Sequence, residues 1–186
     1  MTQRLSILPG LLLGIFLLTL SVGRSYSQDL SILSDFGTSD IVVNGSMVVQ
    51  NGNANTAEIK QLVDAGGSTG HYAEINQDGS ENQAFIDQSG DLNRARINQW
   101  GSGNIANVTQ AGFENFLDVS QTAFGNAFYS TQIGNRNSIV FSQPGAATAN
   151  LVEIGNNNTI NAVQGLGGTM NIRLEGNNLT ATVRQH

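Results

Sequence analysis

Apolar and amide residues occupy every second position in short segments of this chain, and the segments recur with a period of eleven residues. The best copies run from Gln77 to Gln110 and follow the rule Gln-x-Gly-x-x-Asn-x-Ala-x-(Ile/Val)-x-Gln. Alternate residues of a β-strand lie on one face, so Asn, Ala, Ile and Gln of each unit face one way. A helix would scatter these four side chains around its circumference. The pattern therefore predicts one strand per unit.

The segment x-Gly-x-x between strands predicts a tight turn, because glycine adopts backbone angles that other residues avoid. A single strand cannot bury its apolar face alone. Two successive units are therefore expected to face each other in a coil of 22 residues, and coils are expected to stack along one axis. The predicted fold class is all-β, a β-solenoid with cross-β stacking. The predicted turn glycines are Gly52, Gly79, Gly90, Gly101, Gly112 and Gly134.

The inward-facing apolar residues are expected to form the core: Ala57, Ile59, Ala73, Ile75, Ala84, Ile86, Ala95, Ile97, Ala106, Val108, Leu117 and Val119. The inward amides are expected to stack as ladders of like residues, since an unpaired buried amide costs about 1–3 kcal/mol. The predicted ladder comprises Asn55, Gln61, Gln77, Asn82, Gln88, Asn93, Gln99, Asn104, Gln110, Asn115, Gln121, Asn126, Gln132, Asn137 and Gln143. The alternatives are that Asn merely caps a turn and that Gln faces solvent.

Thirteen units fill residues 44–186, with one large irregularity and several small ones. Sixteen residues instead of eleven separate Gln61 from Gln77, and Ala65–Gly70 is the predicted loop insertion. Near the C-terminus, Glu153, Leu174 and Leu179 replace the expected amides. The last coils are therefore expected to direct the stacking of a further coil less well than the middle ones.

Residues 1–27 have the pattern of a secretory signal peptide, with Arg4, an apolar run from Leu11 to Leu20, and small residues before a cleavage site at Gln28. The run is short and lacks a basic stop-transfer flank, which disfavours a membrane-spanning helix. No integral membrane span is expected in the mature chain. Residues 28–43 do not fit the repeat and are expected to form a flexible leader.

The composition excludes several classes of protein. The net charge is −6, and it becomes −8 once Arg4 and Arg24 are removed with the signal peptide, so nucleic acid is not an expected partner. The chain has no cysteine, which rules out disulfides and thiolate metal sites. His71 and His186 are far apart in the repeat, and no catalytic, cofactor-binding or metal-binding residues are predicted.

The repeat resembles that of the curlin family, the subunits of curli amyloid fimbriae, from about Asn44 to Gln185. The resemblance implies secretion to the bacterial cell surface through a curli-type outer-membrane pore with accessory factors. It also implies polymerisation with itself and with other curlin subunits into fibres for adhesion and biofilm matrix. The family has major subunits and minor, nucleating ones, and the degenerate C-terminal units here are more similar to the minor type.

Two other functions are compatible with a β-solenoid. A monomeric rod that binds sugar or ice needs a flat outward row of like residues, whereas the outward positions here are mixed. A polysaccharide-active enzyme needs clustered carboxylates. The outward positions of the repeat carry a different residue in each unit, so the carboxylates there are not a repeated row: Glu58, Glu74, Asp87 and Asp118. In the turns, Trp100, Phe113 and Phe124 either form an exposed aromatic line or pack against the neighbouring coil.

Overall fold

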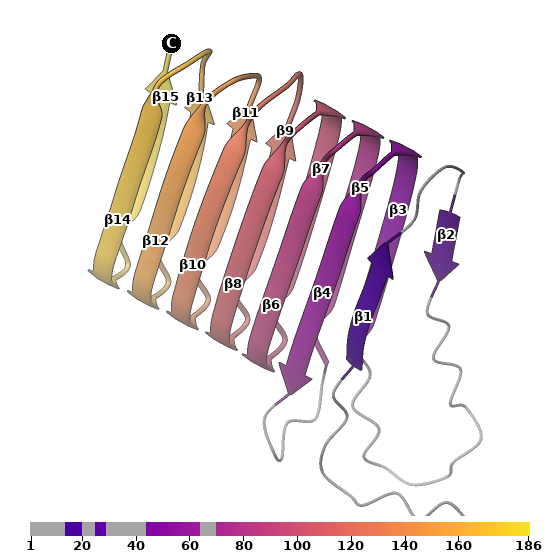
Figure 1. Cartoon of the computed structure of the whole chain (residues 1–186). Coiled ribbons are helices and arrows are strands. Elements are labelled where there is room, and N and C mark those ends of the chain that lie inside the picture. The colour runs from indigo at the N-terminus through magenta and orange to yellow at the C-terminus, as the bar shows by residue number, and fades with distance from the viewer. Residues whose placement is uncertain (1–13, 20–24, 29–43, 64–69) are drawn as a thin grey trace, which may run out of the picture.

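Stacked strands make up all the regular structure of the described residues (Figure 1). The computed structural model describes residues 14–19, 25–28, 44–63 and 70–186. Thirteen strands correspond one to one to the predicted units, and the predicted β-solenoid is confirmed. They are β3 (Gly45–Asn53), β4 (Thr56–Val63), β5 (Tyr72–Ser80), β6 (Gln83–Asp91), β7 (Arg94–Ser102), β8 (Ile105–Phe113), β9 (Phe116–Gln121), β10 (Ala127–Asn135), β11 (Ser138–Gln143), β12 (Thr148–Asn156), β13 (Thr159–Gln164), β14 (Thr169–Asn177) and β15 (Thr180–Gln185).

Consecutive strands alternate between two parallel sheets. Sheet A has the order β4-β6-β8-β10-β12-β14, and sheet B has the order β3-β5-β7-β9-β11-β13-β15. Identical residues pair between neighbouring strands, as Ala84 with Ala106 and Gln88 with Gln110. Each side chain therefore lies above its counterpart in the preceding coil.

The register survives changes in coil length. Partners are 22 residues apart in the middle of the chain, 27 apart from Gln50 to Gln77, and 21 apart from Gln132 to Glu153. Equivalent positions still pair across all of these steps. The length differences are therefore absorbed in the turns. The predicted loop insertion at Ala65–Gly70 lies, apart from Gly70, outside the described residues.

Two further short strands add to the N-terminal edges of the sheets. β1 (Gly14–Thr19) pairs antiparallel with β4, and β2 (Ser25–Gln28) pairs antiparallel with β3. The rest of the predicted signal peptide, and the predicted leader beyond Gln28, lie outside the described residues. No helix in the described ranges is both long and apolar enough to cross a bilayer.

The core lies between the two sheets. All twelve predicted core residues are at most 3% exposed and belong to one continuous cluster. Beyond Gln121 some core residues of the two sheets are larger than in the preceding coils. Phe128 from sheet A stacks on Phe141 from sheet B with ring centroids 4.9 Å apart. In β14 and β15, Ile172, Leu174, Ala181 and Val183 are only partly buried, so the core thins toward the C-terminal end.

Candidate functional site: the stacked amide columns

Glutamine side chains form one column in each sheet, between the core and the end of each strand. In both columns each Gln as far as Gln143, except Gln132, donates from Nε2 to Oε1 of the next Gln toward the C-terminus, at 2.7 to 3.1 Å. Sheet A contributes Gln61, Gln88, Gln110 and Gln132, and sheet B contributes Gln50, Gln77, Gln99, Gln121, Gln143 and Gln164.

The same Nε2 atoms also link the two sheets. Gln110 of β8 donates to the main-chain carbonyl of Arg94 in β7, and Gln132 of β10 donates to that of Phe116 in β9. Each glutamine thus has partners along the axis and across the coil. The fifteen predicted ladder residues are at most 4% exposed, which excludes the alternative of solvent-facing glutamines.

Asparagine side chains combine the two roles that the sequence left open. Oδ1 of Asn82 accepts from the main-chain N–H and from Nδ2 of Asn104, at 3.1 and 3.0 Å. Nδ2 of Asn82 donates to the carbonyl of Gly101 in the next coil. Nδ2 of Asn93 also donates to the main-chain carbonyl of Ser89, four residues earlier. These asparagines therefore form ladders and close turns at the same time.

His71 takes the place of an asparagine without interrupting its column. Its main-chain N–H donates to Asn44 Oδ1 at 2.9 Å, and its Nδ1 accepts from the main-chain N–H of Asn93 at 3.2 Å. Nε2 lies 3.0 Å from the carbonyl of Leu62. Since Nδ1 accepts, Nε2 carries the proton and donates to Leu62.

The turn glycines also stack, and their positions leave no room for a side chain. The six predicted turn glycines have φ between 100° and 126°, a range that favours glycine. A Cβ built on any of them would overlap the carbonyl group of the residue below it in the next coil. Sequence reasoning missed a second left-handed position, directly before Asn, where Glu81, Leu92 and Glu114 have φ of 55° to 58°.

The glutamine column of sheet A is interrupted near the C-terminus, whereas in sheet B Gln185 of β15 lies in register with Gln164. Gln132 donates to Glu153 instead of to a glutamine, and Leu174 follows Glu153 in the register. Ala147 occupies the asparagine position after Asn126, and Oδ1 of Asn126 is buried without a hydrogen-bond partner.

Glu153 is the one carboxyl group in the described part of the glutamine columns. Its Oε2 accepts from Gln132 Nε2 at 2.9 Å, while its Oε1 is buried without a partner. Burial raises the pKa of this carboxyl to about 7, and the hydrogen bond from Gln132 opposes that rise. The group is therefore largely protonated in mildly acidic solution. The sequence places Glu153 at an inward glutamine position, but it does not show the unpartnered oxygen or the raised pKa.

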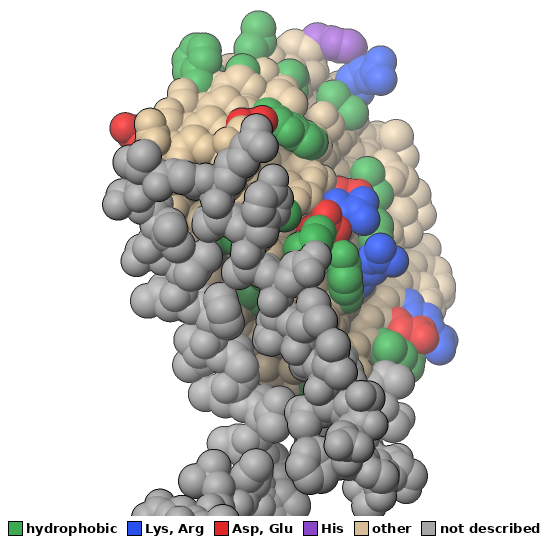
Figure 2. Space-filling view, turned by 90° about the vertical axis from the view of Figure 1, so that its right-hand side faces the viewer, with side chains coloured by type: hydrophobic (Ala, Val, Ile, Leu, Met, Phe, Trp, Pro, Cys, Tyr) green, Lys and Arg blue, Asp and Glu red, His purple; other side chains and the backbone are tan. Residues whose placement is uncertain are grey.

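The outer faces carry mixed charge. Arg96 lies between Glu74 and Asp118, with nitrogen–oxygen distances of 3.1 and 3.5 Å, and Lys60 pairs with Asp87. Basic and acidic side chains lie beside one another in Figure 2 as well. Three of the four outward carboxylates considered as candidate catalytic groups thus take part in ion pairs. No group of three or more His, Cys, Asp or Glu within the described ranges is arranged to hold a metal ion.

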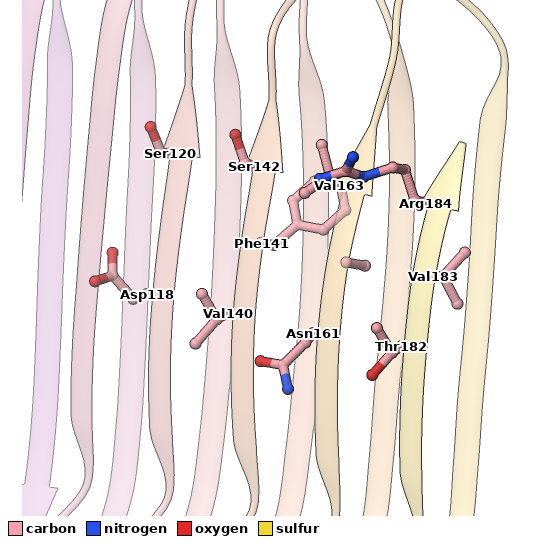
Figure 3. Close-up of a pocket in the computed structure, with 11 residues that line it drawn as sticks. Asp118, Ser120, Val140, Phe141, Ser142, Asn161, Val163, Thr182, Val183 and Arg184 are labelled. Atoms are coloured by element: carbon pink, nitrogen blue, oxygen red, sulfur yellow. The ribbon is translucent and has the colours of Figure 1, made fainter. Parts of the chain in front are cut away.

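A shallow depression of about 380 Å³ lies on the outer face of sheet B, across β9, β11, β13 and β15 (Figure 3). Its lining includes Ser120, Val140, Asn161 and Thr182 from successive strands. Ser120 and Ser142 are paired in register, and no residue type repeats in register across all four strands.

The turn aromatics do not form one line. Trp100 ends β7 of sheet B, and Phe124 lies in the turn after β9 of the same sheet, so both are on the edge where the chain leaves sheet B. They are 44% and 65% exposed. Phe113 ends β8 of sheet A, at the opposite edge, where the Arg136 guanidinium lies 5.9 Å from its ring centroid. The alternative that Trp100, Phe113 and Phe124 form a single exposed line is therefore wrong.

Replacing one column glutamine should weaken the stack, and replacing its outward neighbour should not. Gln110→Leu leaves Oε1 of the buried Gln132 without its donor and removes the bond to Arg94. We expect the free energy of unfolding to fall by about 2–3 kcal/mol. The control Thr109→Leu, on the outer face, should change it by less than about 0.5 kcal/mol. Denaturant titration followed by circular dichroism measures both, and equal effects would contradict a role for the column.

Comparison with known proteins agrees with this geometry in the best-preserved part of the chain. The family model described as curlin associated repeat matches residues 71–101 and 79–112, which contain β5 to β8 apart from Phe113. Residues 71–112 therefore contain curlin associated repeats. Searches of curated proteins and of solved structures each found no match. In the matched segment every Asn and Gln position of the repeat is filled and buried, with His71 as the one substitution.

Proposed function

We propose that this curlin-repeat protein is a secreted structural subunit of curli-like amyloid fimbriae, and that it polymerises by end-to-end stacking of coils. The observation that carries the proposal is the pair of glutamine columns, whose hydrogen bonds run along the axis from coil to coil. A further subunit placed on the axis extends the same two sheets without any change of fold.

The ends of the solenoid support this proposal. β14 and β15 are the last strands of their sheets, and no described strand pairs with their outer edges. Monomeric solenoids cover such edges with polar capping units, since unpaired main-chain groups invite strand addition. At the other end, cleavage before Gln28 removes β1 and all but the last residue of β2. That cleavage uncovers the edges of β4 and β3.

The proposed cellular setting follows from the resemblance to curlin subunits. The chain is exported by its signal peptide and passes a curli-type outer-membrane pore with accessory factors. It then joins fibres of itself and other curlin subunits at the cell surface, where it serves adhesion and biofilm matrix. The absence of cysteine suits passage of an extended chain, because no disulfide can close a loop before export.

Assembly of the chain without residues 1–27 tests the proposal. Purified from denaturant and diluted into buffer, it should form fibres that bind thioflavin and give a meridional reflection near ~4.8 Å. Seeds made from these fibres should shorten the lag of fresh monomer. A chain that stays monomeric under these conditions, with or without seeds, would refute the proposal.

A further inference from the structure

All hydrogen bonds in the glutamine columns point the same way along the axis. Gln77 donates to Gln99, and Gln88 donates to Gln110, so the donor is always on the N-terminal side. Gln50 and Gln61, the first members of the columns, donate onward, and no described residue donates to their Oε1 atoms. Each first member can therefore accept a hydrogen bond from an amide placed on its N-terminal side.

The asparagine columns impose a second requirement on a neighbouring coil. The main-chain N–H of each later asparagine donates to Oδ1 of the earlier one, as Asn104 to Asn82 and Asn115 to Asn93. A coil stacking on the C-terminal side therefore needs an Oδ1 beneath it at both asparagine positions. Between β6–β7 and β8–β9 both glutamine links and both asparagine links are present.

The C-terminal face, defined as the outer edges of β14 and β15, lacks most of these groups. Leu174 occupies the glutamine position of β14, and Gly168 and Leu179 occupy the two asparagine positions. Gln185 is the only amide left at the four positions. A second copy of this chain, with its β4 next to β14 and its β3 next to β15, would thus find one link of the four.

We propose that the two ends of this solenoid differ in function. The N-terminal face, defined as the outer edges of β3 and β4, binds the last coil of a different curlin subunit that carries amides at all four positions. The C-terminal face adds further copies of this chain more weakly, because it offers one of the four links. The inference rests on the proposed function and adds to it the polarity of assembly and the kind of partner.

The partner is identified by the hydrogen bonds that the N-terminal face needs. Gln50 and Gln61 require two amide donors, and this chain supplies one of them, from Gln185. The main-chain N–H groups at Asn44 and Asn55 require two side-chain oxygens, and this chain supplies none. A curlin coil of the type formed by β6 and β7 supplies all four.

A repaired variant serves as the probe for such a partner. Leu174→Gln with Leu179→Asn restores one glutamine and one asparagine in the last coil, both at positions with ordinary backbone angles. The matched control changes the outward neighbours, Arg173→Gln with Thr180→Asn. All chains lack residues 1–27. We expect the repaired chain to leave at least about tenfold less soluble protein at steady state than wild type, and the control to match wild type.

Growth at single fibre ends tests the polarity. Short fibres of the repaired chain are fixed to glass, and wild-type monomer is added in a second colour. Asn107→Cys supplies the dye site, because the chain has no cysteine and Asn107 is exposed on the outer face. The wild-type monomer should add mainly at one end, and that end should then grow more slowly than an end extended with repaired monomer. Repaired monomer should extend both ends.

The outcomes separate the two proposals. Wild-type monomer that extends both ends as fast as repaired monomer does would overturn the polarity and leave fibre formation intact. Equal steady-state solubility of the wild-type and repaired chains would do the same. Failure of both chains to form any fibre would overturn the proposed function and the polarity together. A monomer that carries Gln50→Leu and Gln61→Leu should fail to add to the fixed fibres. That result would support the assignment of the N-terminal face as the binding face of the added monomer.

Discussion

Gly101→Ala should prevent the coil that contains β7 and β8 from stacking on the next one, whereas Gly103→Ala in the same turn should be tolerated. Gly101 has φ of 111°, and a Cβ on it would overlap the carbonyl group of Ala123 in the next coil. The clash involves main chain on both sides, so no side-chain rotation relieves it. We expect a loss of about 4 kcal/mol or more in the free energy of unfolding.

Gly103 is a close control because it is a glycine with positive φ in the same turn, with open space where Gly101 meets main chain. It has φ of 64°, and nothing lies within 4 Å of a Cβ built on it. Ala54 already occupies the equivalent position of another turn with φ of 55°. Gly103→Ala should therefore cost only about 1 kcal/mol. Denaturant midpoints and thioflavin kinetics compare the two variants, and similar losses for both would contradict this account of the glycine column.

Stability should fall as pH rises through neutrality, because of Glu153. The pKa of this carboxyl is about 7 in the folded chain, against 4.5 for an ordinary glutamate. Between those values the folded state keeps a proton that the unfolded state has lost. The folded state is therefore favoured most at pH below 4.5, loses stability as pH rises to about 7, and changes little above it. The full difference is about 3 kcal/mol.

Glu153→Gln should remove this pH dependence and raise stability at pH 8. The amide stays neutral at every pH and restores the donor that every other glutamine of the column supplies. Glu58→Gln, on the outer face of β4, is the control and should keep the wild-type profile. The measurement is the free energy of unfolding between pH 5 and pH 8. A wild-type slope that persists in Glu153→Gln would show that another group is responsible.

The repeat predicted the strands and their faces well because each position is decided by local geometry. Alternation placed Ala95 and Ile97 on one face and Arg94 and Arg96 on the other, and the structure buries the first pair and leaves the second pair partly or fully exposed. The period then fixed the register, since a shift by one residue would place charged side chains in the core.

Two features with weaker local signals were missed. One is the left-handed residue before each Asn, where Glu81 and Leu92 show no turn preference. The other is the outer asparagine series from Asn135 through Asn156 to Asn177, in which each main-chain N–H donates to the next Oδ1.

The sequence by itself determined the solenoid, because an eleven-residue period of alternating residues allows few other ways to bury its apolar face. It also identified the side chains that stack and the departures near the C-terminus. Only the tertiary structure decided what those residues do. The direction of the glutamine hydrogen bonds, the protonation of Glu153 and the contact that forbids a side chain at Gly101 all depend on neighbours in another coil. These neighbours are about 20 residues away in the chain and are brought into contact by stacking alone.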